Sequence, residues 1–185
     1  MQTTRAVATK YALPLLAVYL PVTIVLLLLG SGLNRVPWIA CFAGGLLLWT
    51  SIEYVMHRFV FHEPSAVRGL GSGGAAHSRH HQTPSEAEFI LTPLSFSSPV
   101  AALVFGVLRL VMGSWERAAI MMAGVIAGYL WYEVLHLQIH TNPKAGAFLR
   151  RLRRYHYRHH FNHTDLGFGV TTPLWDVLLR TFPRA

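Results

Sequence analysis

Histidine is the residue type in this chain that is best suited to chemistry, and its spacing is not random. Ten of the 11 histidines fall into four short clusters, HRFVFH, HSRHH, HLQIH and HYRHH. Neutral imidazole is a common ligand for iron, copper and zinc. Ten polar rings in an apolar chain also need partners, because burying an unpaired polar group is costly. The clusters therefore predict a polynuclear metal site formed by His57, His62, His77, His80, His81, His136, His140, His156, His159 and His160.

The composition indicates a membrane protein with one domain. A length of 185 residues suits a single compact unit, so we expect one domain over 1–185. The net charge of +8 could suggest nucleic acid, but 52% hydrophobic residues and a mean hydropathy of +0.37 favour a lipid environment and exclude that partner. Cys41 is the only cysteine, which excludes an intrachain disulfide and a thiolate-rich metal site.

Four apolar stretches approach the ~20 residues that a helix needs to cross a bilayer. In the third stretch Pro93 and Pro99 predict a helix that is kinked or starts late. The first stretch could instead be a signal peptide, but its apolar part exceeds the usual ~7–15 residues. We therefore expect an all-α, integral membrane four-helix bundle with spans at roughly 11–33, 36–60, 89–112 and 118–137.

Short connections and the distribution of basic residues predict the orientation of this bundle. With four crossings, both termini face the same side of the membrane. Twelve lysines and arginines lie on that side, whereas the opposite loops carry only Arg35 and Arg117, so the positive-inside rule makes the side with both termini cytoplasmic. All four histidine clusters map to it. The expected fold is thus a bundle with a cytoplasmic histidine-rich cap.

Helical periodicity tests whether the clusters can each serve one site. His136 and His140 are four residues apart and share a face, and so do the histidines from His156 to His160. His57 and His62 are five apart and diverge by about 140° on a regular α-helix. The helix that carries this pair must therefore end or bulge there.

Two carboxylates accompany the histidines at helical spacing. Glu53 precedes His57 by four residues, and Glu133 precedes His136 by three. A carboxylate inside a membrane helix is costly unless it is paired, which makes both functional candidates. We expect them to orient imidazoles by hydrogen bonds, and an ordinary interfacial hydrogen bond is the alternative.

Taken together, the motifs resemble those of the fatty acid hydroxylase and sterol desaturase superfamily, and in particular the fatty acid 2-hydroxylases. The similar segments follow one another in order over roughly residues 53–182: EYVMHRFVFH, HSRHH, YEVLHLQIH and RRYHYRHHFNHTDLGFGVTTPLWD. The resemblance implies that the ten histidines hold two metals, forming a di-metal cap. It also implies that the segment from Asp165 to Val170 packs close to the site, with Asp165 as a further supporting carboxylate. His163 lies outside the ten-histidine pattern.

The same resemblance implies a non-haem di-iron oxygenase, and we expect the protein in a bacterial inner membrane. Such an enzyme inserts one atom of dioxygen into an acyl chain, at the 2-position of a fatty acid or acyl lipid, and needs two external electrons. We see no fused cytochrome haem domain like that of the eukaryotic members, so we expect a separate donor of the ferredoxin or cytochrome type. Iron is expected because zinc, which can replace it in a purified protein, has no redox chemistry.

Several alternatives remain at this stage. A carotenoid ring hydroxylase or a lipid desaturase uses similar histidine motifs on a similar scaffold. A membrane metal transporter would line a path through the bilayer with histidines, and a structural zinc site would need fewer than ten ligands. The arginines of the fourth cluster could attract a lipid headgroup or serve only as positive-inside anchors: Arg150, Arg151, Arg153, Arg154 and Arg158.

Overall fold

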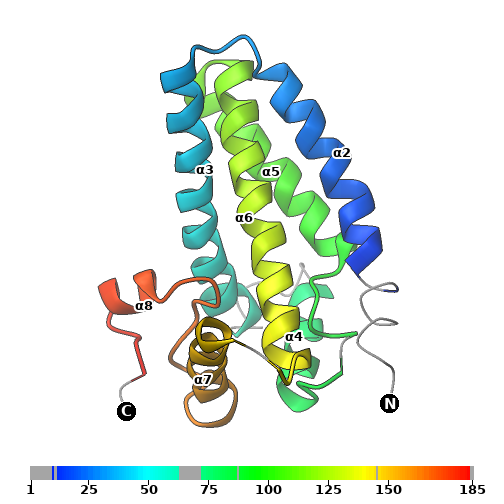
Figure 1. The fold of residues 1–185 in the computed structure, drawn as a ribbon, viewed down its shortest axis with the longest axis vertical. Coiled ribbons are helices and arrows are strands. Elements are labelled where there is room, and N and C mark those ends of the chain that lie inside the picture. The colour runs from blue at the N-terminus through cyan, green and yellow to red at the C-terminus, as the bar shows by residue number, and fades with distance from the viewer. Residues whose placement is uncertain (1–9, 11, 63–71, 87, 145, 184–185) are drawn as a thin grey trace.

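The computed structural model describes residues 10, 12–62, 72–86, 88–144 and 146–183, and the regular elements in these ranges are helices. The predicted all-α class is therefore confirmed. Three of the basic residues behind the predicted sidedness, Arg5, Arg68 and Arg184, lie outside the described residues. Four long helices run side by side (Figure 1): α2 (Leu13–Leu29), α3 (Arg35–Val55), α5 (Leu94–Met112) and α6 (Trp115–Thr141).

Three helical segments of the described chain are long and apolar enough to cross a membrane, namely Arg35–Phe61, Leu94–Met112 and Trp115–Thr141. The remaining long helix, α2, has 17 residues. At 1.5 Å per residue it extends about 26 Å, slightly less than the roughly 30 Å hydrocarbon core. The late start predicted for the third span is confirmed, because α5 begins immediately after Pro93.

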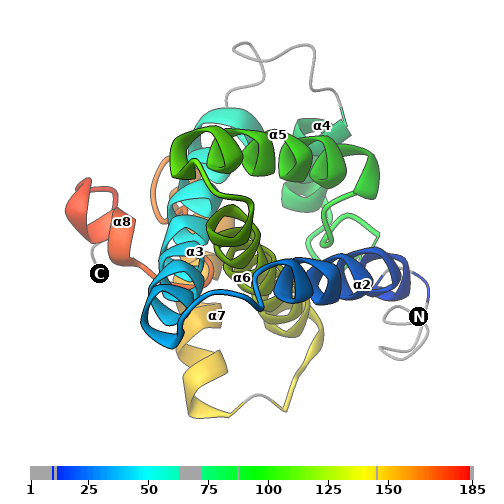
Figure 2. The same ribbon diagram turned by 90° about the horizontal axis from the view of Figure 1, so that it is seen from above.

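Helix α6 is the centre of the bundle and packs against α2, α3 and α5 (Figure 2). Its tightest crossing is with α3, where two glycines let the backbones touch. A Cβ atom on Gly45 would lie 2.0 Å from the Met121 carbonyl oxygen, and one on Gly124 would lie 2.2 Å from that of Phe42. Small residues at such crossings are typical of helices that pack inside membranes.

The histidine-bearing elements gather at one end of the bundle (Figure 1). They are the π-helix η2 (Met56–Phe61), which continues α3, and the helices α4 (Ser72–Gln82) and α7 (Ala147–Phe161), together with the last turns of α6. The short helix α8 (Leu174–Leu178) follows α7 and lies beside α3. A π-turn closes at i+5 rather than i+4, so it brings residues five apart onto one face. The bulge predicted between His57 and His62 is therefore confirmed.

Candidate metal centre

The ten clustered histidines form two groups of five. Within each group one ring nitrogen per residue lies within 4.8 Å of the corresponding atoms of the others. His163 belongs to neither group and is exposed. Group A consists of His57, His62, His77, His81 and His159, and group B consists of His80, His136, His140, His156 and His160.

Two helices divide their histidines between the groups. On α4, His77 and His81 turn toward group A, whereas His80 turns toward group B. On α7, His159 joins group A while His156 and His160 join group B. Each group therefore combines several sequence clusters, which the spacing within any one cluster does not reveal.

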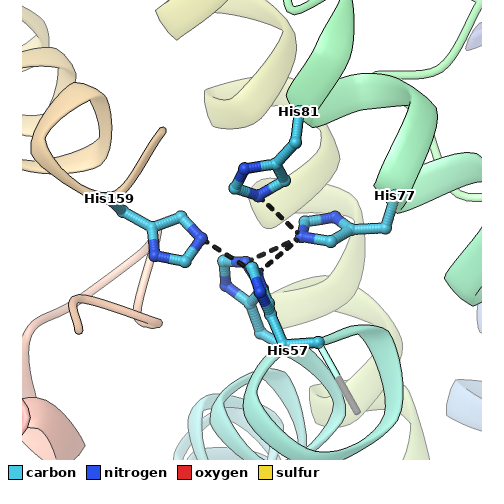
Figure 3. Close-up of side chains that lie close together, drawn as sticks. His57, His77, His81 and His159 are labelled. Atoms are coloured by element: carbon cyan, nitrogen blue, oxygen red, sulfur yellow. Dashed lines mark hydrogen bonds between the residues drawn. The ribbon is translucent and has the colours of Figure 1, made fainter. Parts of the chain in front are cut away.

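In group A the rings converge on a common point (Figure 3). The Nε2 atom of His77 lies 3.1 Å from the Nε2 atoms of His57, His62 and His81. An imidazole nitrogen carries either one N–H or one lone pair, so it cannot form three hydrogen bonds at once. A cation between the rings would satisfy all of these nitrogens together.

Group B has the same arrangement around His156. Its Nε2 atom lies 3.1 Å from that of His136, 3.0 Å from that of His140 and 2.9 Å from that of His160. Two nitrogen ligands that are each about 2.1 Å from a metal and at right angles to each other are about 3.0 Å apart. The observed spacings match this value, and five donors exceed the four of a tetrahedral structural zinc site. The donor sets therefore fit metals that bind several imidazoles.

Burial keeps the histidines outside the membrane-spanning segments neutral. Desolvation lowers the pKa of His80 to about 2, that of His159 to about 3 and that of His81 to about 4. Neighbouring imidazoles lower these pKa values further, because a second positive charge in the same group is unfavourable. At neutral pH the rings are thus in the uncharged form that binds metal.

Backbone carbonyls of the segment 165–170 orient two rings of group A. His57 donates from Nδ1 to the Phe168 carbonyl oxygen, and His159 donates from Nδ1 to that of Leu166 at 2.7 Å. With Nδ1 protonated, the lone pair on Nε2 faces the centre of the group, as a metal ligand requires. The Phe168 ring also lies against the rings of His57, His62 and His159.

This segment is anchored by Asp176, a residue that the sequence analysis missed. Its fully buried carboxylate accepts hydrogen bonds from the backbone N–H groups of Phe168 at 2.9 Å and Gly169 at 2.8 Å. It also accepts one from the Thr181 hydroxyl at 2.8 Å. The sequence feature that could have indicated its role is a single acidic residue inside the apolar run LWDVLL.

The carboxylates of Glu53 and Glu133 have other partners than the expected imidazoles. Glu53 accepts hydrogen bonds from the backbone N–H groups of Val170 and Thr171 and from the Thr171 hydroxyl. Glu133 accepts one from the Thr92 N–H at 3.1 Å. Both residues thus make hydrogen bonds to loops, which is the alternative considered from the sequence, and their role in orienting imidazoles stays a prediction. Asp165, the third expected carboxylate, is exposed to solvent.

Several known proteins are similar to this chain. Residues 42–181 match the family model described as fatty acid hydroxylase. The chain is 34% identical over 148 residues to a fatty acid 2-hydroxylase of Rattus norvegicus, which covers 78% of this chain and 40% of that protein. It is 35% identical over 153 residues to the ceramide very long chain fatty acid hydroxylase SCS7 of Saccharomyces cerevisiae, covering 77% of this chain and 38% of that protein.

A third relative is the dihydroceramide fatty acyl 2-hydroxylase FAH1 of Arabidopsis thaliana, which is 31% identical over 140 residues and covers 75% of this chain and 59% of that protein. A solved structure titled "Full length scs7p (only hydroxylase domain visible)" superimposes with a TM-score of 0.78 at 26% identity, covering 99% of this chain and 67% of that one. The chain therefore spans about two fifths to three fifths of the length of these curated relatives.

Proposed function

Because this chain belongs to the fatty acid hydroxylase family, we propose that it is a membrane-bound lipid hydroxylase. In the proposed reaction one atom of dioxygen enters a C–H bond of an acyl chain, at the 2-position of a fatty acid or acyl lipid. The other oxygen atom leaves as water, with two electrons and two protons supplied from outside. The observation that carries this proposal is the pair of largely buried five-histidine groups, of which group A borders an apolar cavity.

Groups A and B would each hold one iron ion, and His163 would hold none. The bound metals would supply the dioxygen activation and electron transfer that side chains cannot provide. The chain itself keeps its imidazoles neutral, and its backbone carbonyls at Leu166 and Phe168 orient two of them. The Phe168 side chain is buried against group A and excludes water from that side.

The acyl chain has a suitable place between α3, α5 and α6. An apolar cavity there, with about 640 Å³ of empty space including its mouth, is lined by His57 and Phe61 toward the histidines. Toward the middle of the bundle it is lined by Ala101, Val104 and Met122. A chain in this cavity would put one of its carbons beside group A, whereas no histidine of group B lines the cavity.

We further propose the setting of the reaction. Helix α2 would be the fourth crossing of a single domain, with both termini and the histidines on the cytoplasmic side of a bacterial inner membrane. The basic residues on that side support this orientation. A separate ferredoxin or cytochrome would deliver the electrons. A metal transporter fits less well, because both histidine groups lie at one end of the bundle rather than along a path through it (Figure 1).

The test is to express the chain with and without His156→Ala and to compare extracted lipids by mass spectrometry. We expect acyl species that gain one oxygen at the 2-position with the unchanged chain and their absence with His156→Ala. His163→Ala is the matched control, since it removes a histidine outside both groups. Identical lipid profiles from metal-loaded preparations would reject the proposal, and products that have lost two hydrogens would indicate a desaturase instead.

A further inference from the structure

A second cavity lies on the side of α7 that faces away from the histidines. It holds about 1020 Å³ of empty space, including its open mouth, and is formed by α7 and by the segments before and after α8. Three arginines line it, together with aromatic and hydroxyl side chains, and none of the described residues that line it is acidic. We call this cavity the arginine groove, and the arginines are Arg151, Arg154 and Arg158.

The three arginines share one face of α7 because they are three and four residues apart. They are exposed, whereas His156, His159 and His160 on the same helix are buried. The guanidinium groups of these three arginines have no ion pair or hydrogen bond among the described residues, and their charges repel one another.

Arg153 shows the contrast within the same helix. It donates hydrogen bonds to the carbonyl oxygens of Ile139, Gln138 and Asn142 and so fastens α7 to the end of α6. The arginines of the groove make no comparable contact with the protein. Their charge is therefore available for an anion from outside the chain.

Helix α8 connects the arginine groove to a candidate membrane span. Helix α8 lies beside α3, which is long and apolar enough to cross the membrane (Figure 1). The Trp175 indole fastens the two helices by donating from Nε1 to the Thr50 hydroxyl at 3.0 Å. The outer side of α8 is apolar, since Val177 is 58% exposed and Leu178 is 61% exposed. An exposed apolar surface next to a cluster of basic residues is typical of an element that lies in the lipid interface.

We propose that the arginine groove binds the phosphate-bearing headgroup of an anionic membrane lipid, whose acyl chains lie along α8 and α3. Guanidinium groups bind phosphate oxygens through paired, charge-assisted hydrogen bonds. The Thr172 hydroxyl accepts a hydrogen bond from the Leu174 N–H, so its own proton remains available to a phosphate oxygen. This site is separate from groups A and B, and its occupation does not depend on the proposed hydroxylation.

The test compares two charge-matched variants of the full chain. Arg151→Gln/Arg154→Gln removes two charges from the groove, and Arg35→Gln/Arg117→Gln removes two exposed charges from the predicted opposite loops. Each protein is placed in phosphatidylcholine nanodiscs with or without a minor fraction of phosphatidylglycerol, and bound lipid is measured by native mass spectrometry. Metal content and thermal stability confirm that both variants are folded.

We expect phosphatidylglycerol to bind the unchanged chain in preference to phosphatidylcholine, and the groove variant to lose about 30-fold in affinity. The control variant should bind as the unchanged chain does. Equal lipid binding by the two variants would overturn the proposal, and so would binding of inorganic phosphate alone as tight as that of the lipid. The proposal would also be overturned if the groove variant kept its lipid binding but no longer bound a soluble acidic redox protein. That result would make the groove a docking face for the electron donor.

Discussion

Groups A and B contain the same number of histidines but are built in different ways. In group B, four of the five residues are pairs spaced four apart on a regular helix, His136 with His140 on α6 and His156 with His160 on α7. In group A, His57 lies on the π-helix η2 and His62 directly follows that helix. Regular helix spacing thus suffices to bring most histidines of group B onto shared helix faces. Group A requires an irregular turn to bring His57 and His62 together.

The groups also differ in what orients their rings. In group A the Nδ1 atoms of His57 and His159 donate to carbonyls of the 165–170 segment. In group B the buried Nδ1 atoms of His156 and His160 have no hydrogen-bond partner among the described residues. Group A therefore depends on a loop, and group B depends on the packing of helices. Perturbing the loop should accordingly affect group A first.

The largest expected effect comes from removing the central histidine of either group. His77→Ala and His156→Ala should each lose one of the two metals, and each should lower turnover more than about 100-fold, beyond what loss of a supporting contact causes. Metal per chain, measured by elemental analysis, would fall by half in both variants. Loss of both metals from either variant would show that the groups do not bind independently.

A smaller, selective effect is expected from Asp176→Asn. The amide keeps the size of the side chain but lacks the charge that holds the backbone of Phe168 and Gly169. Group A should bind metal about 10 to 100 times more weakly, because its rings lose their orientation, while group B should be unchanged. Chelator titration followed by metal analysis would separate the two sites. Asp165→Asn, an exposed change near the start of the same segment, is the control.

The cavity beside group A can be shortened without touching a histidine. Ala101 lies on α5 in the cavity wall, and the ring of Ala101→Phe would occupy part of the cavity. Hydroxylation of long acyl chains should therefore fall several-fold while shorter chains are still accepted. Leu103→Phe adds a ring on the same helix at a position that is 68% exposed, and it should change nothing. Product chain lengths measured by mass spectrometry check this, and an equal loss for all lengths would place the acyl chain elsewhere.

Low pH should affect groups A and B differently, with a smaller effect than the substitutions above. An unfolded histidine has a pKa near 6.5, whereas burial lowers the pKa of His81 in group A to about 4 and that of His80 in group B to about 2. Below pH 6.5 the unfolded chain therefore binds more protons, and the stability of the metal-free protein should fall as the pH drops toward 4. Group A should also release its metal at a higher pH than group B. Melting curves and metal release against pH would show both effects.

The smallest effect is expected from His163→Ala. This histidine is exposed and lies outside both groups, so metal content and turnover should stay within about twofold of the unchanged chain, as for most surface changes. A loss of metal comparable to that of His77→Ala would mean that a group extends beyond its five members. Elemental analysis decides this in the same experiment as the first prediction.

Local rules were enough to predict much of this molecule. Ten imidazoles in an apolar chain call for a shared metal site, and the five-residue spacing of His57 and His62 required a bulge that appears as η2. Prolines indicated the late start of α5. In contrast, the loop partners of Glu53 and Glu133 were not predicted, because spacing along one helix says nothing about loops that arrive from elsewhere in the chain.

The sequence by itself determined which residues could bind metal and that helices would carry most of them, because residue chemistry and helical spacing are local properties. Only the tertiary structure decided how the ten histidines divide into two groups. His62 and His159 are 97 residues apart, yet their Nε2 atoms lie 3.1 Å from each other. Such a meeting depends on how α3, α6 and α7 pack and on a loop held by the buried Asp176, and no pattern within a single segment contains that information.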